Sequence, residues 1–183
     1  IAMPEEYGGA GLGVTEAAIM MHTVAKTRGA MSAASSIHMN IFGPHPISVF
    51  GNEEQKQRWI PDLVQGKYKS CFGVTEPNSG LNTAALQTRA ERTNNGWVVN
   101  GRKIWTSTAQ VASKIMLIAR TTPQEDCAKP IDGLSLFFTD LNRDYCDVRR
   151  IPKMGRKAVD SNEVFIDGLR IPEEDLIGEE GKG

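Results

Sequence analysis

Residues 71–83 read Cys-Phe-Gly-Val-Thr-Glu-Pro-Asn-Ser-Gly-Leu-Asn-Thr, and the pattern of the chain changes here from helical to extended. A predicted strand ends at Thr75, Pro77 fixes a turn, and residues 78–80 form a small polar loop. Because Gly80 permits close approach, the loop could offer main-chain N–H groups to a phosphate or to the polar edge of a ring. From the spacing alone, an ordinary β-turn without a ligand is the favoured interpretation.

The 69 residues before the strand carry helical patterns. Apolar residues recur at helical spacing from Val14 to Thr27, which predicts one helix. A second helix is predicted over Ser32 to Phe42, and Pro44 and Pro46 should end it.

A third helix is predicted to begin after Asn52. This residue is a good N-cap, and Gln55 lies three positions later, as in a variant of the capping box. We expect the helix to break or kink at Pro61 and to finish by Gly66.

Extended segments dominate the rest of the chain. The run 94–96, Asn-Asn-Gly, separates two of them, and Asn100-Gly101 predicts another turn. The continuous apolar run Ile115 to Ala119 is typical of a strand buried on both faces. Further strands are predicted at 133–139, 147–151 and 162–167. Helices followed by strands predict an α+β fold, with a helical unit at 1–69 and a β unit at 70–183.

The composition narrows the function. Of 183 residues, 40% are hydrophobic and 23% are charged, as in ordinary globular proteins, and the net charge of −1 gives no general reason to expect nucleic-acid or membrane binding. No apolar run approaches the ~20 residues that span a bilayer. The three cysteines suit neither a disulfide framework nor a metal cluster, so they indicate a reducing compartment, and the three histidines lack metal-site spacing.

A second informative stretch is 103–108, Lys-Ile-Trp-Thr-Ser-Thr. The tryptophan offers a flat apolar surface beside three hydroxyl groups, which suits a planar heteroaromatic cofactor. The alternative is a core tryptophan in a threonine-rich strand. The basic cluster at 149–157 could bind phosphates or an electron-transfer partner, although a solvated face is the simpler interpretation.

Together these stretches resemble the amino-terminal and middle parts of the acyl-CoA dehydrogenase family of flavoproteins. The resemblance covers essentially the whole chain in consistent order. It implies a helical amino-terminal segment, then a mostly antiparallel β domain, with the family's carboxy-terminal helical domain absent. The matching segments are 4–13, 50–61, 74–77, 105–107, 151–155 and 164–172.

The resemblance implies FAD as cofactor, bound against the β domain. Thr75 would bond the pyrimidine edge of the isoalloxazine, Trp105 would pack on the flavin, and Ser107 would stand near N5, where the family usually has threonine. Gly80 would leave room for the pyrophosphate. The residues that the resemblance assigns to cofactor binding are Phe72, Val74, Thr75, Gly80, Leu81, Trp105, Thr106 and Ser107.

The loop departs from the family at one position. The family usually reads Gly-Ser-Asp or Gly-Thr-Asp where this chain has Gly80-Leu81-Asn82. The hydroxyl that commonly contacts the pyrophosphate is therefore absent at Leu81. Ser79, Thr83 or main-chain N–H groups alone are the candidates to replace it.

The implied reaction is α,β-dehydrogenation of an acyl-CoA to the 2,3-enoyl-CoA, with electrons passed to an electron-transfer flavoprotein. The catalytic base belongs to the family's carboxy-terminal domain, so residues 1–183 alone should be nearly inactive, and Glu76 is a structural carboxylate. The full-length protein is expected to form a homo-oligomer, commonly a tetramer in this family. The compartment would be the cytoplasm in bacteria, which we prefer, or the mitochondrial matrix in eukaryotes.

Two other functions stay open. One is an acyl-CoA oxidase or flavin monooxygenase of the same fold, which rapid reoxidation of reduced flavin by oxygen would indicate. The other is a flavin-free scaffold protein, which Leu81 and the absent base keep open. Retention of Thr75, Trp105 and Ser107 together argues against the scaffold.

Overall fold

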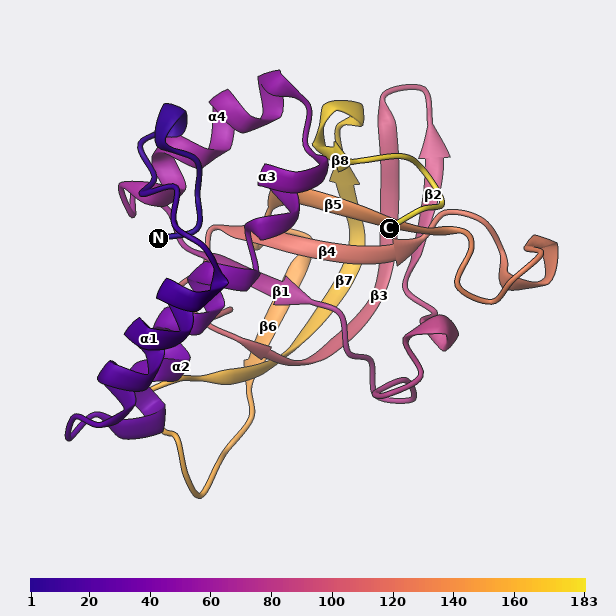
Figure 1. The fold of residues 1–183 in the computed structure, drawn as a ribbon. Coiled ribbons are helices and arrows are strands. Elements are labelled where there is room, and N and C mark those ends of the chain that lie inside the picture. Colours follow the sequence, from indigo (N-terminus) through magenta and orange to yellow (C-terminus); the bar gives the residue numbers. More distant parts are fainter.

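The computed structural model describes all residues from 1 to 183, with helices first and strands after them. This order confirms the predicted α+β class. In Figure 1 the helices lie together on one side of the strands, and the amino terminus lies among them. The helical elements are η1 (Glu5–Tyr7), α1 (Val14–Ala25), α2 (Ala30–Phe42), α3 (His45–Phe50) and α4 (Glu53–Val64).

Eight strands form one sheet in the order β6-β7-β3-β2-β4-β5-β8, and β1 pairs with β4 off this path. All neighbours are antiparallel except β1–β4 and β2–β4, so the prediction of a mostly antiparallel sheet is confirmed. The strands are β1 (Ser70–Gly73), β2 (Arg89–Thr93), β3 (Gly96–Ser107), β4 (Lys114–Arg120), β5 (Leu134–Asp140), β6 (Cys146–Arg150), β7 (Ser161–Ile171) and β8 (Leu176–Ile177). Short 3-10 turns lie at η2 (Thr83–Ala85), η3 (Gln124–Asp126) and η4 (Glu173–Asp175).

The capping box at α4 is confirmed. Asn52 Oδ1 accepts from Gln55 N at 2.8 Å, and Gln55 Oε1 accepts from Asn52 N at 3.0 Å. The expected break at Pro61 is wrong, because the helix continues through it to Val64. A proline removes one main-chain donor, and the buried Trp59 just before it holds the helix on the core.

One further prediction is confirmed, and another is wrong. Pro44 and Pro46 end one helix as expected, but Pro46 also lies in the first turn of α3, where a helix tolerates proline. Asn100-Gly101 is not a turn, because β3 runs through it. A Cβ on Gly101 would lie 2.5 Å from Thr88 Oγ1, so this glycine serves a close approach inside the sheet.

Strand β4 is buried on both faces, as predicted. Ile115 and Leu117 pack into the core cluster formed by the strands. Met116, on the opposite face, packs with Trp59 and Ile47 of the helices in a second cluster. This alternation places the helices against one face of β4, β5 and β8.

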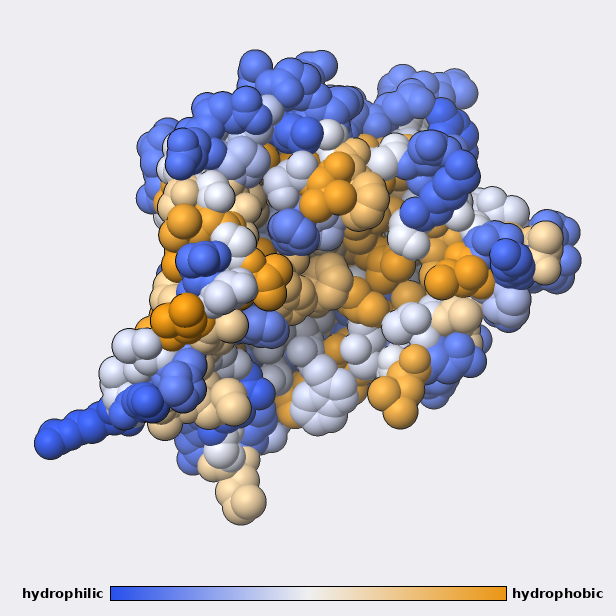
Figure 2. Space-filling view, in the orientation of Figure 1, coloured by the Kyte–Doolittle hydropathy of each residue, from blue (hydrophilic) through white to orange (hydrophobic).

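The helices differ in how much of their apolar surface the rest of the chain buries. Along α1 only Ala17 is buried, Met21 and Val24 are half-buried, and Val14 is largely exposed, so the predicted apolar face is only partly packed within this chain. Figure 2 shows apolar side chains gathered in the middle of one face, over β4 and β5. None of the helices has both the length and the apolar character needed to cross a membrane.

Candidate functional site

The loop after β1 runs beside β3, and this contact joins the two informative stretches. Ile104 N donates to Thr75 O at 2.8 Å. Lys103 Nζ donates to Val74 O at 3.1 Å. The half-buried Val74 and Thr75 therefore lie next to the segment that carries Trp105.

A bulge in β3 turns Trp105 outward. The pairing of β3 with β7 shifts register between Lys103 and Thr106, and Trp105 has φ +61°. A positive φ is uncommon for a residue with a side chain, and bulges redirect side chains next to functional sites. Trp105 is 57% exposed, whereas Trp59 and Trp97 are 2% and 1% exposed. Trp105 thus presents a free aromatic face on the segment whose Ile104 is bonded to Thr75.

The two hydroxyl residues after Trp105 differ in how far their side chains are exposed to solvent. Ser107 is partly exposed, but Thr106 is buried, and its Oγ1 has no hydrogen-bond partner. The Thr106 carbonyl accepts from Asn162 Nδ2 at 2.9 Å. The side chain of Thr106 therefore does not reach the open face, so the cofactor-binding role predicted for it can involve only main-chain atoms.

Helix α2 contributes aromatic neighbours that the sequence analysis did not identify. Phe42 packs edge-on against the half-buried Phe72, with ring centroids 5.4 Å apart. His38 stacks on Phe42 at 4.4 Å. The spacing of these two residues by four places them on one helix face, which is the signal that could have paired them, but nothing local indicates that this face meets β1.

The polar loop is a closed turn with unused donors at its tip. Glu76 and Ser79 exchange both main-chain hydrogen bonds, at 3.0 and 3.1 Å. Ser79 Oγ donates to Asn82 O at 2.5 Å, so its buried hydroxyl closes the loop and is not free to replace the one missing at Leu81. The N–H groups of Gly80, Leu81 and Asn82 donate to no other atom of the chain. Successive free N–H groups of this kind suit an anion.

The space beside the loop tip is open. A Cβ on Gly80 would meet no atom within 4 Å, and the Leu81 side chain is fully exposed. A ligand could therefore reach the loop backbone at Gly80, where the family resemblance predicts room for a pyrophosphate.

A buried ion pair lies directly behind these segments. Lys103 Nζ is 2.8 Å from Glu76 Oε1, and the two side chains are 0% and 6% exposed. Burial opposes ionisation of Glu76, but the charge of Lys103 and hydrogen bonds from its neighbours lower the pKa of this carboxyl below its usual value. Burial lowers the pKa of Lys103 to about 8, against the attraction of Glu76. A carboxylate that is held in this way is not placed to act as a general base.

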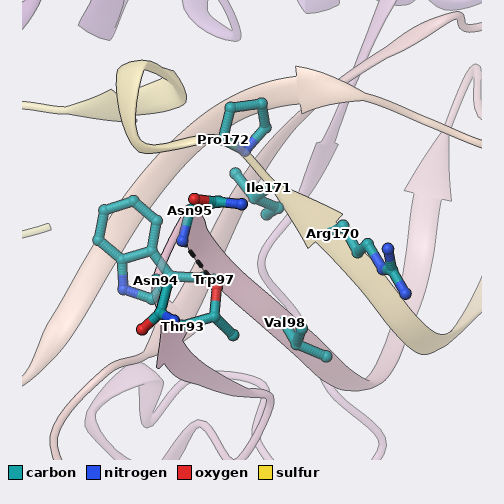
Figure 3. A pocket seen from close by; sticks show the side chains of 8 residues that line it. All are labelled: Thr93, Asn94, Asn95, Trp97, Val98, Arg170, Ile171 and Pro172. Atoms are coloured by element: carbon teal, nitrogen blue, oxygen red, sulfur yellow. Dashed lines mark hydrogen bonds between the residues drawn. The ribbon is translucent and has the colours of Figure 1, made fainter.

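A cavity of about 480 Å³ lies elsewhere, beside the β2–β3 turn. Figure 3 shows Trp97, Asn95 and Ile171 around it, while the Arg170 side chain points away from Thr93 and Asn95. None of its lining residues belongs to the predicted site. Asparagine and threonine groups without a nucleophile or a general base give this cavity no evident chemistry.

Comparison with known proteins agrees with this geometry. The model of the acyl-CoA dehydrogenase N-terminal domain matches residues 1–67, and that of the acyl-CoA dehydrogenase middle domain matches residues 71–169. An acyl-CoA dehydrogenase of Bacillus subtilis is 33% identical over 100% of this chain and 47% of its own length. A mitochondrial isovaleryl-CoA dehydrogenase of Oryza sativa subsp. japonica is 28% identical over 100% of this chain and 44% of its own length.

Solved structures give the same result. A probable acyl-CoA dehydrogenase from Mycobacterium abscessus superposes with a TM-score of 0.92 at 29% identity, over 100% of this chain and 48% of its own. The FAD complex of PigA superposes with a TM-score of 0.91 at 26% identity, over 100% of this chain and 47% of its own. The chain spans about half the length of the relatives that it matches. From the two matching domain models, we conclude that the chain belongs to the acyl-CoA dehydrogenase family.

Proposed function

We propose that the full-length protein uses FAD to oxidise an acyl-CoA thioester to the 2,3-enoyl-CoA. The observation that carries this proposal is the outward-turned Trp105 beside Thr75, because a strained, exposed tryptophan next to polar groups suits a planar cofactor. The PigA structure, which contains FAD, supports the choice of cofactor.

The residues of the site fit an isoalloxazine ring. Trp105 offers the aromatic face, Phe72 and Val74 offer apolar edges, and the Thr75 and Ser107 hydroxyls offer hydrogen bonds. No side-chain hydrogen bond within the chain occupies Thr75 or Ser107 in the way that Ser79 is occupied. The site therefore combines a flat apolar surface with free polar groups.

The loop tip fits the pyrophosphate. The free N–H groups of Gly80, Leu81 and Asn82 would replace the hydroxyl that the family commonly supplies at position 81. Thr83 remains a second candidate, because its side chain is exposed.

Bound FAD would supply a two-electron acceptor that takes the substrate's β-hydrogen as hydride. The chain's own residues would bind and orient: Trp105 covers one face, and Thr75 and Ser107 fix the polar edge. The α-proton must go to a base, and the buried, paired Glu76 is not that base. We place the base outside residues 1–183.

We also propose two structural units, a helical one at 1–69 and a flavin-binding one at 70–183. The change from helices to strands between α4 and β1 supports this division. An electron-transfer flavoprotein as electron acceptor, a homo-oligomeric assembly, and a cytoplasmic or mitochondrial-matrix location belong to the same proposal. Relatives from Bacillus subtilis and from plant mitochondria are consistent with either compartment.

The first test is the visible spectrum of the full-length protein, purified without added cofactor. We expect flavin bands that bleach when an acyl-CoA is added without oxygen. Fast reoxidation by oxygen would identify an oxidase or monooxygenase instead. A colourless protein that takes up no added FAD would contradict the proposal and favour a flavin-free scaffold. As a matched control, Trp97→Phe alters a buried tryptophan outside the site and should leave FAD uptake unchanged.

A further inference from the structure

The buried pair of Lys103 and Glu76 lies close along the chain to two residues of the proposed flavin site, Thr75 and Trp105. Glu76 follows Thr75 directly, and Lys103 precedes Trp105 by two positions. Lys103 Nζ donates to both Glu76 Oε1, at 2.8 Å, and Val74 O, at 3.1 Å. Burying two charges carries a penalty that is repaid only when several further hydrogen bonds are well placed.

The pair joins three separate segments of the chain. Glu76 Oε2 accepts from Gln87 N at 2.6 Å, and Glu76 Oε1 accepts from Thr88 N at 2.9 Å. Glu76 belongs to the loop after β1, Gln87 and Thr88 lead into β2, and Lys103 belongs to β3. One carboxylate and one ammonium group therefore hold these segments together, in addition to the main-chain bond from Ile104 N to Thr75 O and the pairing of β2 with β3.

The pair also holds one end of the β3 bulge. Lys103 is the last residue in register with β7 before the shift, and Thr106 is the first after it. At the far end, Asn162 Nδ2 donates to Thr106 O at 2.9 Å, and Gln110 Nε2 donates to Asn162 Oδ1 at 2.8 Å. A strained backbone such as that of Trp105 persists only where its surroundings determine it at both ends.

We propose that Lys103 and Glu76 are a positioning pair, which fixes the outward orientation of Trp105 and its place beside Thr75. Neither side chain reaches the open face, so the pair acts through the Val74 carbonyl and the bulge. The ligand that this arrangement would bind is FAD, and this half of the proposal rests on the proposed function. The role of the pair in orienting Trp105 does not depend on the proposed function.

The test uses the full-length protein with Lys103→Met, Glu76→Gln and the double variant. The exposure of Trp105 is measured in the apoprotein by acrylamide quenching of tryptophan fluorescence. The contribution of Trp105 is the difference in quenching between each protein and the same protein that also carries Trp105→Phe. FAD affinity and the urea midpoint are measured in parallel. Glu163→Gln is the control. It breaks the half-exposed ion pair in which the Arg102 guanidinium lies 2.9 Å from Glu163 Oε1, and Arg102 lies next to Lys103 on β3.

We expect the single variants to weaken FAD binding about tenfold or more, because the site loses its preorganisation. The double variant should recover the urea midpoint, since removing both charges leaves no unpaired ion. Its Trp105 quenching and its FAD affinity should nevertheless remain altered. Glu163→Gln should change neither.

A double variant with normal stability, normal Trp105 quenching and normal FAD affinity would overturn the proposal. A double variant that does not fold would also count against it, because the pair would then be needed for folding itself. If no protein, the parent included, binds FAD, the proposed function fails. The quenching of Trp105 then still decides whether the pair positions this residue.

Discussion

Replacement of Arg120 by methionine should destabilise the fold strongly, although this residue contacts no acidic group. The buried guanidinium donates to four main-chain carbonyls, those of Leu86 at 3.1 Å, Ala84 at 2.8 Å, Asp132 at 3.1 Å and Pro130 at 3.1 Å. It thereby ties two loops to the end of β4. Hydrogen bonds from a charged donor contribute ~1.5–3 kcal/mol each, but carbonyls near the surface regain water, so we count about 1 kcal/mol each and about 4 kcal/mol in total.

In a chain of this size, about 4 kcal/mol corresponds to a fall in Tm of roughly 8–16 °C. Circular dichroism during heating and urea unfolding of Arg120→Met would measure it. Arg89→Met is the matched control, because Arg89 is exposed and pairs only with Glu91, so the change should stay within about 0.5 kcal/mol. If the Tm of Arg120→Met lies within about 2 °C of the Tm of the parent, the conclusion that Arg120 holds the two loops against the end of β4 is refuted.

Trp105→Ala should weaken FAD binding by about tenfold or more in a titration of the full-length protein, with little change in Tm, because the exposed ring contributes little to the core. Asn52→Ala should lower the free energy of unfolding by about 1 kcal/mol in urea, through loss of the α4 cap. Cys127 should react with a thiol reagent in the folded protein while Cys71 stays protected, since burial raises the pKa of Cys71 to about 12; equal labelling rates would contradict this. Despite its burial, Glu76 has a lowered pKa because of Lys103, so its carboxylate stabilises the fold above the unfolded pKa of about 4.5, and this stability is lost as pH falls through the folded pKa. The stability difference between the parent and Glu76→Gln should therefore shrink below about pH 4.5 in urea titrations, and a constant difference would argue against it.

The sequence predicted those elements that depend on neighbouring residues. The Asn52 cap, the turn at 94–96 and the apolar strand at 115–119 are local patterns, and the structure confirms each of them. The α+β order follows from the same patterns, because periodicity changes from helical to extended near Ser70. Membership of the family is likewise evident from the order of motifs along the chain.

The site was only partly predictable. The period of two along β3 places Lys103 on the same inward face as Trp97 and Val99, which indicates a buried lysine that needs an acid. No local pattern identifies that acid as Glu76, because 26 residues separate the two and only the contact between the loop after β1 and strand β3 brings them together. The same limit applies to Phe42, which reaches Phe72 from a different part of the fold.

By itself, the sequence determined the fold class, the capped helix and the turn at 94–96, whereas the residues expected to meet a flavin followed only from the family resemblance and stay a prediction. Only the tertiary structure decided that Trp105 faces outward at a bulge, that Thr106 is buried and that the Ser79 hydroxyl is already occupied. The physical reason is the distance along the chain over which each effect acts. Propensity and capping act within a few residues, whereas a side chain's exposure and hydrogen-bond partners depend on segments that the folded sheet brings together from distant parts of the chain.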